Sequence, residues 1–154
     1  MQNKSWEHLS KFDDSDNSLG FLLWKVSIKW RRKIEVTLTK YDLTHTQFVM
    51  LATTAYLTRN DNMVTQVEIA EFSSCDINTT SQVLRGLEKR LLIVRTVMDG
   101  NEKSKYPKLT DFGFNILKPA IKDVEAIDEV FFSALTNSKK QQLSINLSQL
   151  IDYT

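Results

Sequence analysis

The segment from Thr65 to Gly113 limits the fold of this chain more than any other part of the sequence. Thr65 is followed three residues later by Glu68, the capping-box pair that opens a helix. A turn of small polar residues ends this helix, and a second amphipathic segment then runs to about Arg90. The β-branched run Ile93–Val97 and a lysine-rich return segment predict the two strands of a hairpin. The order helix, turn, helix, hairpin is that of a winged helix-turn-helix.

The second helix of this pattern has two chemically different faces on a helical wheel. Apolar residues and one threonine gather on one side, at Ile77, Thr80, Val83, Leu84, Leu87 and Leu91. Amides and cations lie opposite, flanked by two hydroxyl residues, at Asn78, Gln82, Arg85, Lys89, Thr79 and Ser81. Any helix with one face in water shows the same division. This helix alone therefore does not distinguish a solvated face from a face that contacts a partner.

The second helix of a winged helix-turn-helix lies in the major groove of DNA. Asn and Gln can pair with adenine, and Arg with guanine, through the edges of the bases. Hydroxyl groups and lysine suit the phosphate oxygens of the backbone. The expected base-edge contacts are therefore Asn78, Gln82 and Arg85, and the expected backbone contacts are Thr79, Ser81 and Lys89.

The hairpin that follows this helix concentrates positive charge. Between Arg85 and Lys108 there are seven cations against three anions, although the whole chain carries a net charge of only +1. A local basic patch is the electrostatic footprint of nucleic-acid binding, whatever the overall charge. We expect Lys103 and Lys105 to act on DNA from the wing, with Arg95 at its base.

Helical patterns flank the winged region on both sides. Apolar residues at spacings of three and four, caps and turn clusters predict helices over about 19–39, 44–59, 110–135 and 138–151. Thr44 opens the second of these with Gln47 as its capping-box partner, and Pro119 is a point where the third can bend. Residues 1–17 read as a loose arm with a short helix around 6–12. The fold class is therefore mainly α, with a small β-hairpin wing and a helical body.

Length and composition exclude several classes of protein. A chain of 154 residues with 42% hydrophobic residues favours one domain, 1–154, with a sizeable core. Apolar stretches fall short of the roughly 18–20 residues of a membrane span, and the N-terminus lacks a secretory signal. A single cysteine excludes an intramolecular disulfide and fits a cytoplasmic protein. No phosphate-cradling glycine loop, catalytic triad or metal-ligand spacing is present, so we expect no enzyme, no cofactor and no metal site.

Three further features have a functional and a structural interpretation. Cys75 lies in the turn before the second helix, but no second cysteine or adjacent cation supports a redox role. The basic run Lys29–Lys33 is expected to be a solvated helix face rather than a phosphate contact. Core or dimer packing is favoured over a ligand pocket for the aromatic residues Phe21, Trp24, Trp30 and Tyr56.

From about Leu19 to its C-terminus, the chain resembles the MarR family of transcriptional regulators. The segments that carry the resemblance are Leu43–Leu51, Thr65–Ala70, Thr79–Arg90 and Leu109–Gly113. The resemblance implies a homodimer in which about 44–110 form the DNA-binding lobe and about 19–40 with 111–152 form the dimerisation body. It also implies binding to a palindromic site and, in many members, a response to a small ligand or to oxidation.

Two positions depart from the family's pattern. Leu91 stands where the family usually carries glycine after the recognition helix. A left-handed residue other than glycine costs about 1 kcal/mol or more, so this helix is open to a different ending. Asn101-Glu102-Lys103 replaces the family's Asp-x-Arg motif in the wing. Lysine keeps the charge without the planar fork of arginine, which predicts a wing that adds affinity more than specificity.

The sequence therefore predicts a sequence-specific, DNA-binding transcriptional regulator, with repression as the expected sign. A two-fold dimer would read an inverted repeat whose half-sites lie about one helical turn apart. A small-molecule effector stays open as a further partner. The alternative is a winged-helix module that makes protein–protein contacts and has lost specific DNA binding.

Overall fold

The computed structural model describes residues 6, 9–98 and 101–153, and the side chains of 98 and 101–104 are outside this description. The chain is mainly helical with one antiparallel hairpin, which confirms the predicted fold class. Its long elements are α1 (Leu19–Leu38), α2 (His45–Leu57), α3 (Gln66–Phe72), α4 (Ile77–Lys89), β1 (Ile93–Met98), β2 (Asn101–Leu109), α5 (Asp111–Phe132) and α6 (Asn137–Tyr153). Two short 3-10 helices, η2 (Ser15–Asn17) and η3 (Thr39–Tyr41), lie at either end of α1.

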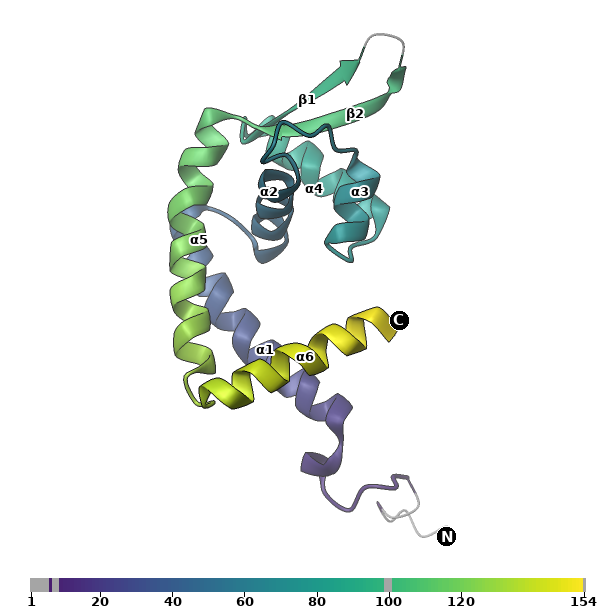
Figure 1. Cartoon of the computed structure of the whole chain (residues 1–154), viewed down its shortest axis with the longest axis vertical. Helices are drawn as coiled ribbons and strands as arrows, with labels where there is room; N and C mark the ends of the chain where they lie inside the picture. The colour runs from purple at the N-terminus through teal and green to yellow at the C-terminus, as the bar shows by residue number, and fades with distance from the viewer. Residues whose placement is uncertain (1–5, 7–8, 99–100, 154) are drawn as a thin grey trace.

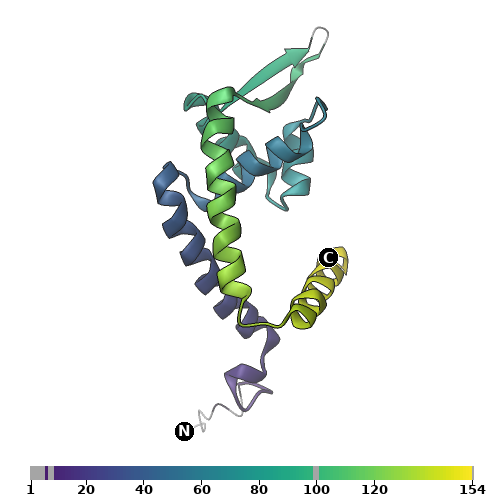
Figure 2. The same ribbon diagram turned by 60° about the vertical axis from the view of Figure 1, so that its left-hand side comes forward.

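The elements separate into a compact lobe and an extended helical body (Figure 1). α2, α3, α4 and the hairpin gather at one end, while α1 and α5 pack against each other and lead away from the lobe. α6 projects from the far end of α5, clear of α1 in the second view (Figure 2), and none of its residues is buried. The hairpin therefore lies at one end of the molecule, and the segment with η2 before α1 lies at the other (Figure 1).

The helices of the lobe begin where their capping residues predict. Both capping boxes form: the Thr44 N–H donates to Gln47 Oε1 at 3.0 Å, and the Thr65 N–H donates to Glu68 Oε2 at 2.7 Å. Asp76 accepts the Thr79 N–H at 2.8 Å and so caps α4. These side chains satisfy backbone donors that a helix N-terminus otherwise leaves without partners.

One apolar core holds the lobe together and continues into the body. It is built from side chains that are at most 2% exposed, including Met50, Leu51, Ile69, Leu84, Leu87, Leu92, Ile93, Ile34, Leu38 and Leu117. The buried face of α4 agrees with the helical wheel at Thr80, Leu84 and Leu87. Ile77 and Leu91, placed on the same face from sequence, are 41% and 69% exposed because they lie at the ends of the helix.

The hairpin is longer than predicted on its second strand. β2 runs from Asn101 rather than from Ser104, and Ile93 pairs with Leu109 at the base. The predicted turn at 99–101 lies largely outside the described residues. Pro107 lies opposite Arg95 on an edge strand, because both strands of a two-stranded sheet are edge strands. Its side chain is fully buried.

The helices outside the lobe also end close to their predicted limits. α1 stops at Leu38, one residue early, and α5 stops at Phe132 instead of about Leu135. α5 continues past Pro119 as one helix (Figure 1). The short helix predicted around 6–12 includes two residues outside the described part of the chain.

α4 ends in a left-handed turn at Leu91. The sequence had left this ending open, because Leu91 stands where the family usually carries glycine. Leu91 has a φ of 60°, and the Leu91 N–H donates to the Glu88 carbonyl at 2.9 Å. The Leu92 N–H then reaches back to the Leu87 carbonyl at 3.0 Å. These two bonds form a Schellman motif, which normally has glycine at the left-handed position. The helix therefore ends as it would with glycine, and Leu91 carries the conformational cost.

Replacing Leu91 with glycine is expected to stabilise the protein by about 1 kcal/mol, because glycine adopts a positive φ without steric cost. Little packing is lost, since Leu91 is 69% exposed. Urea unfolding at fixed protein concentration measures the change. Leu91→Ala is the control, because alanine keeps the left-handed cost. Equal effects of the two substitutions would show that the φ of Leu91 is not the cause.

Candidate nucleic-acid interface

The polar face of α4 is open to solvent along its whole length. Asn78, Gln82, Arg85 and Lys89 are exposed at successive turns, as the helical wheel predicted. Thr79 and Ser81 flank this row and are half-buried. The structure thus places all six α4 residues selected from sequence on or beside one surface.

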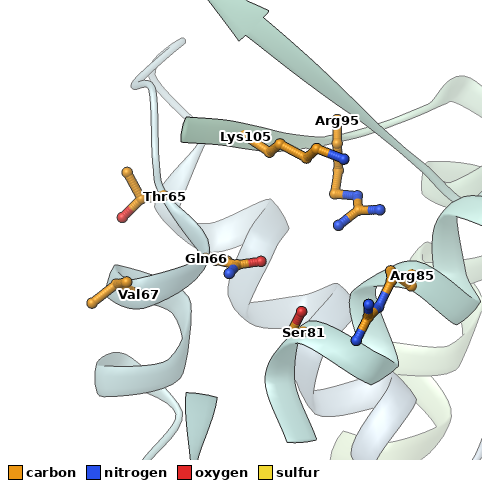
Figure 3. A pocket seen from close by; sticks show the side chains of 7 residues that line it. All are labelled: Thr65, Gln66, Val67, Ser81, Arg85, Arg95 and Lys105. Atoms are coloured by element: carbon orange, nitrogen blue, oxygen red, sulfur yellow. The ribbon is translucent and has the colours of Figure 1, made fainter. Parts of the chain in front are cut away.

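A hollow of about 370 Å³ lies between the first turn of α3, the middle of α4 and the hairpin. Arg95 turns from the hairpin toward Arg85 of α4, and Lys105 runs along its strand toward Arg95 (Figure 3). The other wall is formed by residues 65–67 at the start of α3. Three cationic side chains from the consecutive elements α4, β1 and β2 therefore line one concave surface, a suitable environment for an anion such as a backbone phosphate.

Arg95 forms an ion pair with the Glu88 carboxylate, on which Lys105 also acts through its charge. Its Nε donates to Glu88 Oε2 at 2.9 Å, Nη2 bonds the same oxygen, and the Arg95 side chain is only 8% exposed. The hydrogen bond from Arg95 lowers the pKa of Glu88. The pair joins β1 to the last turn of α4, so it fixes the wing relative to that helix. The DNA contact expected of Arg95 stays a prediction.

The two wing lysines differ in what the structure describes. Lys105 is exposed on β2 and lines the hollow beside Arg95. Lys103 lies on the same strand, but its side chain is outside the described residues. The structure therefore brings Lys105 to the surface of α4 and leaves the Lys103 contact a prediction.

The N-terminus of α4 already holds a negative charge. Asp76 accepts the Thr79 N–H, and its hydrogen bonds with Thr79 lower its pKa below the usual range. An anionic cap stabilises the positive end of the helix. It also competes for donors with any phosphate placed there, so binding is expected to depend more on side chains than on the amides of this turn.

The sequence analysis missed a contact network at the other end of α4. Arg90 Nη1 donates to the Asp42 carbonyl at 2.7 Å, and Nη2 lies 3.2 Å from Asp42 Oδ2. Nη1 also lies 3.4 Å from Gln47 Oε1. Gln47 was recognised only as a cap for α2, and no local pattern links it to a residue 43 positions away.

A second network that was missed joins the lobe to the body. Trp30 Nε1 donates to Asp128 Oδ1 at 2.7 Å, which links α1 to α5. The His45 ring packs edge-on against Trp30, with 5.2 Å between ring centroids. His45 is half-buried. Of the four aromatic residues considered for a pocket, Trp30 packs against the core, and Phe21, Trp24 and Tyr56 are exposed.

Acidification is expected to weaken the fold through His45. Burial lowers its pKa below the ordinary value of 6.5, the charge of Arg31 acts in the same direction, and Glu35 and Asp128 oppose it. The unfolded chain therefore takes up this proton first, so stability is complete above about pH 6.5 and decreases as the pH falls below it. Urea midpoints at pH 8 and pH 5.5 should differ less in His45→Gln than in the wild type. An equal change of the urea midpoint with pH in both proteins would contradict the role of His45.

The part of the chain that the structure describes contains no helix long and apolar enough to cross a membrane. Within the same residues, no group of three His, Cys, Asp or Glu side chains could hold a metal ion. Cys75 is half-buried and packs against the core in the turn between α3 and α4.

Comparison with known proteins identifies relatives over nearly the whole chain, although no protein-family model matches. The HTH-type transcriptional regulator YdcH of Bacillus subtilis is 36% identical over 144 residues, covering 94% of this chain and 97% of YdcH. The Staphylococcus aureus MepR–DNA complex has a TM-score of 0.78 and 24% identity, with 88% of this chain and 97% of MepR covered.

A second solved structure carries the family name. It is the MarR family protein Rv2887 of Mycobacterium tuberculosis in complex with salicylic acid, with a TM-score of 0.66 and 26% identity. The match covers 90% of this chain and 98% of Rv2887. Of these relatives, YdcH is a transcriptional regulator and MepR is bound to DNA in its solved structure. The extent of the identity to YdcH and the winged-helix architecture together show that the chain belongs to the MarR family of helix-turn-helix transcriptional regulators.

Proposed function

We propose that this DNA-binding regulator acts in the cytoplasm as a homodimer that represses transcription from an inverted-repeat operator. The observation that carries the proposal is the open polar face of α4 beside a hollow lined by cations. A duplex laid along α4 would place its bases against that face and a phosphate strand in the hollow.

Each residue of this surface has a proposed role that follows from its chemistry and place. The residues proposed to contact base edges are Asn78, Gln82 and Arg85, and those proposed to contact the backbone are Thr79, Ser81 and Lys89. Lys103 and Lys105 act from the wing. Arg95 supports them from the base of the wing, where its pairing with Glu88 leaves it a smaller share of the binding energy.

The proposed dimer uses the helical body, about 19–40 and 111–152, and leaves the lobe, about 44–110, free for DNA. Large apolar side chains of α1 and α6 support this division because they are exposed in the single chain. They include Leu19 at 83%, Leu23 at 55%, Trp24 at 63%, Leu150 at 60% and Tyr153 at 89%. Exposed apolar groups on this scale mark a surface that another protein covers.

The proposal includes a small-molecule effector but names no particular compound. The salicylic acid complex of the M. tuberculosis relative supports a ligand-responsive regulator.

Selection of genomic DNA fragments by the purified protein at physiological salt tests the proposal. Enrichment of one palindromic motif, bound by two protomers per site, is the expected result. Retention that depends on salt but enriches no motif would overturn sequence-specific regulation by the isolated protein. Absence of retention would favour the alternative, a winged-helix module for protein contacts.

A further inference from the structure

The guanidinium of Arg90 connects three parts of the molecule. Arg90 is the C-cap of α4, directly after the last helical residue, Lys89. Its donors reach the Asp42 carbonyl at 2.7 Å, the Asp42 carboxylate at 3.2 Å and Gln47 Oε1 at 3.4 Å. A planar fork with five N–H donors can serve all three acceptors, which a lysine ammonium on a single flexible stem cannot do in the same geometry.

The acceptors of Arg90 lie where the helical body joins the lobe. Asp42 follows η3 at the end of α1 and has a φ of 53°, a left-handed conformation that turns its carbonyl away from the regular path of the chain. Gln47 Oε1 also accepts the Thr44 N–H in the capping box of α2. One side chain thus ties the end of the proposed recognition helix to the end of α1 and the start of α2.

The carbonyl of Asp42 is the more important acceptor of Arg90. The Asp42 side chain is 96% exposed, so its ion pair with Arg90 is screened by water and contributes little. The bond to the carbonyl is shorter and depends on the backbone conformation of the turn rather than on charge. The Arg90 side chain is 32% exposed, and its partners hold it against the α1–α2 junction rather than against the hollow beside α4.

We propose that Arg90 is a positioning residue for operator binding. It sets the angle of α4 relative to the helical body, and in a dimer this angle sets the separation of the two recognition helices. Arg90 does this without contacting DNA. The inference rests on the proposed function, since it assigns a determinant of specificity to the same interface.

Substitutions at two neighbouring residues distinguish a positioning role of Arg90 from an effect of its charge on DNA binding. Arg90→Gln and Lys89→Gln each remove one cation from the same end of α4. Lys89→Gln is expected to weaken binding to all sequences alike and to lower the salt slope by about 0.9. Arg90→Gln is expected to weaken binding to the selected operator about tenfold, with the salt slope and the affinity for random duplex DNA nearly unchanged.

Two further variants test the geometry of the contact. Arg90→Lys keeps the charge and loses the fork, so it is expected to reproduce most of the loss caused by Arg90→Gln. Asp42→Asn keeps the carbonyl and tolerates the left-handed turn, so it is expected to bind the operator within about twofold of wild type. Wild-type affinity in Arg90→Lys, or a lower salt slope in Arg90→Gln, would show a charge contact and overturn the proposal.

A measurement without DNA keeps this inference distinct from the proposed function. Spin labels at Glu71→Cys on α3 and Glu125→Cys on α5, in a Cys75→Ser background, report the angle between lobe and body. Dilution with unlabelled protein restricts the signal to distances within one chain. Arg90→Gln is expected to broaden or shift this distance distribution while urea unfolding shows a folded protein. An unchanged distribution overturns the positioning role, whereas wild-type protein that selects no operator overturns only the proposed function.

Discussion

Replacing Gly113 with alanine is expected to destabilise the protein by about 3 kcal/mol or more. A Cβ at this position would lie 1.9 Å from the Leu92 carbonyl oxygen and 2.8 Å from its carbon. Atoms cannot approach so closely, and the obstacle is backbone rather than the end of a flexible side chain. Either α5 or the junction between α4 and β1 must therefore move.

The Leu92 carbonyl has little freedom to move out of the way. It accepts the Thr110 N–H at 3.1 Å, and the Thr110 hydroxyl lies 3.2 Å from it while donating to the neighbouring Leu91 carbonyl at 2.6 Å. Thr110 also caps α5 by accepting the Gly113 N–H at 2.9 Å. Leu92 and Ile93 are each 1% exposed, so a shift of this segment would also disturb the core. The clash is consequently expected to affect the wing, the end of α4 and the start of α5 together.

Gly86→Ala is the matched control for Gly113→Ala. Gly86 lies inside α4, and an added Cβ there would meet nothing within 4 Å. The substitution should stabilise the protein by roughly 0.5–1 kcal/mol, because alanine loses less conformational entropy in a helix. Urea unfolding at one fixed protomer concentration measures both variants, since the proposed dimer would make stability depend on concentration. A similar loss of stability in both would contradict the close-contact explanation.

The parts of this fold that short sequence patterns predicted are those whose physical cause is local. The boxes Thr44–Gln47 and Thr65–Glu68 form because cap and partner are three residues apart, and the same is true of Asp76 and the Thr79 amide. The exposed row on α4 follows from helical geometry alone. These patterns placed the starts of α2 and α3 and, within one residue, the end of α4.

The parts that the sequence did not predict depend on the packing of distant segments. Arg90 and Asp42 are separated by 48 positions, and nothing in either neighbourhood indicates the other. The left-handed Leu91 contradicts its own local preference, because the Schellman bonds and the burial of Leu92 compensate for it. Glu88 counted only as an anion in the sequence, yet it is the partner that holds Arg95.

Truncating Arg85 to alanine is expected to reduce operator binding by about 1–3 kcal/mol and to relax specificity at one base pair. Arg85 is exposed at the middle of the polar face, and its side chain borders the hollow beneath the wing (Figure 3). Within the described residues, the Arg85 side chain makes no hydrogen bond or ion pair with the rest of the chain. The substitution should therefore leave the stability of the free protein nearly unchanged and act on DNA contacts alone.

Lys105→Ala is the comparison variant that distinguishes a base contact of Arg85 from a phosphate contact. Lys105 borders the same hollow from the wing and is proposed to contact a phosphate, so its loss should weaken binding to every sequence and lower the salt slope by about 0.9. Affinities for the selected operator and for its single-base variants, each at several salt concentrations, distinguish the two behaviours. If Arg85→Ala instead weakened all sequences equally and lowered the salt slope, Arg85 would be a backbone contact. Base recognition would then fall to the amides Asn78 and Gln82, which predicts an operator half-site read mainly at adenines.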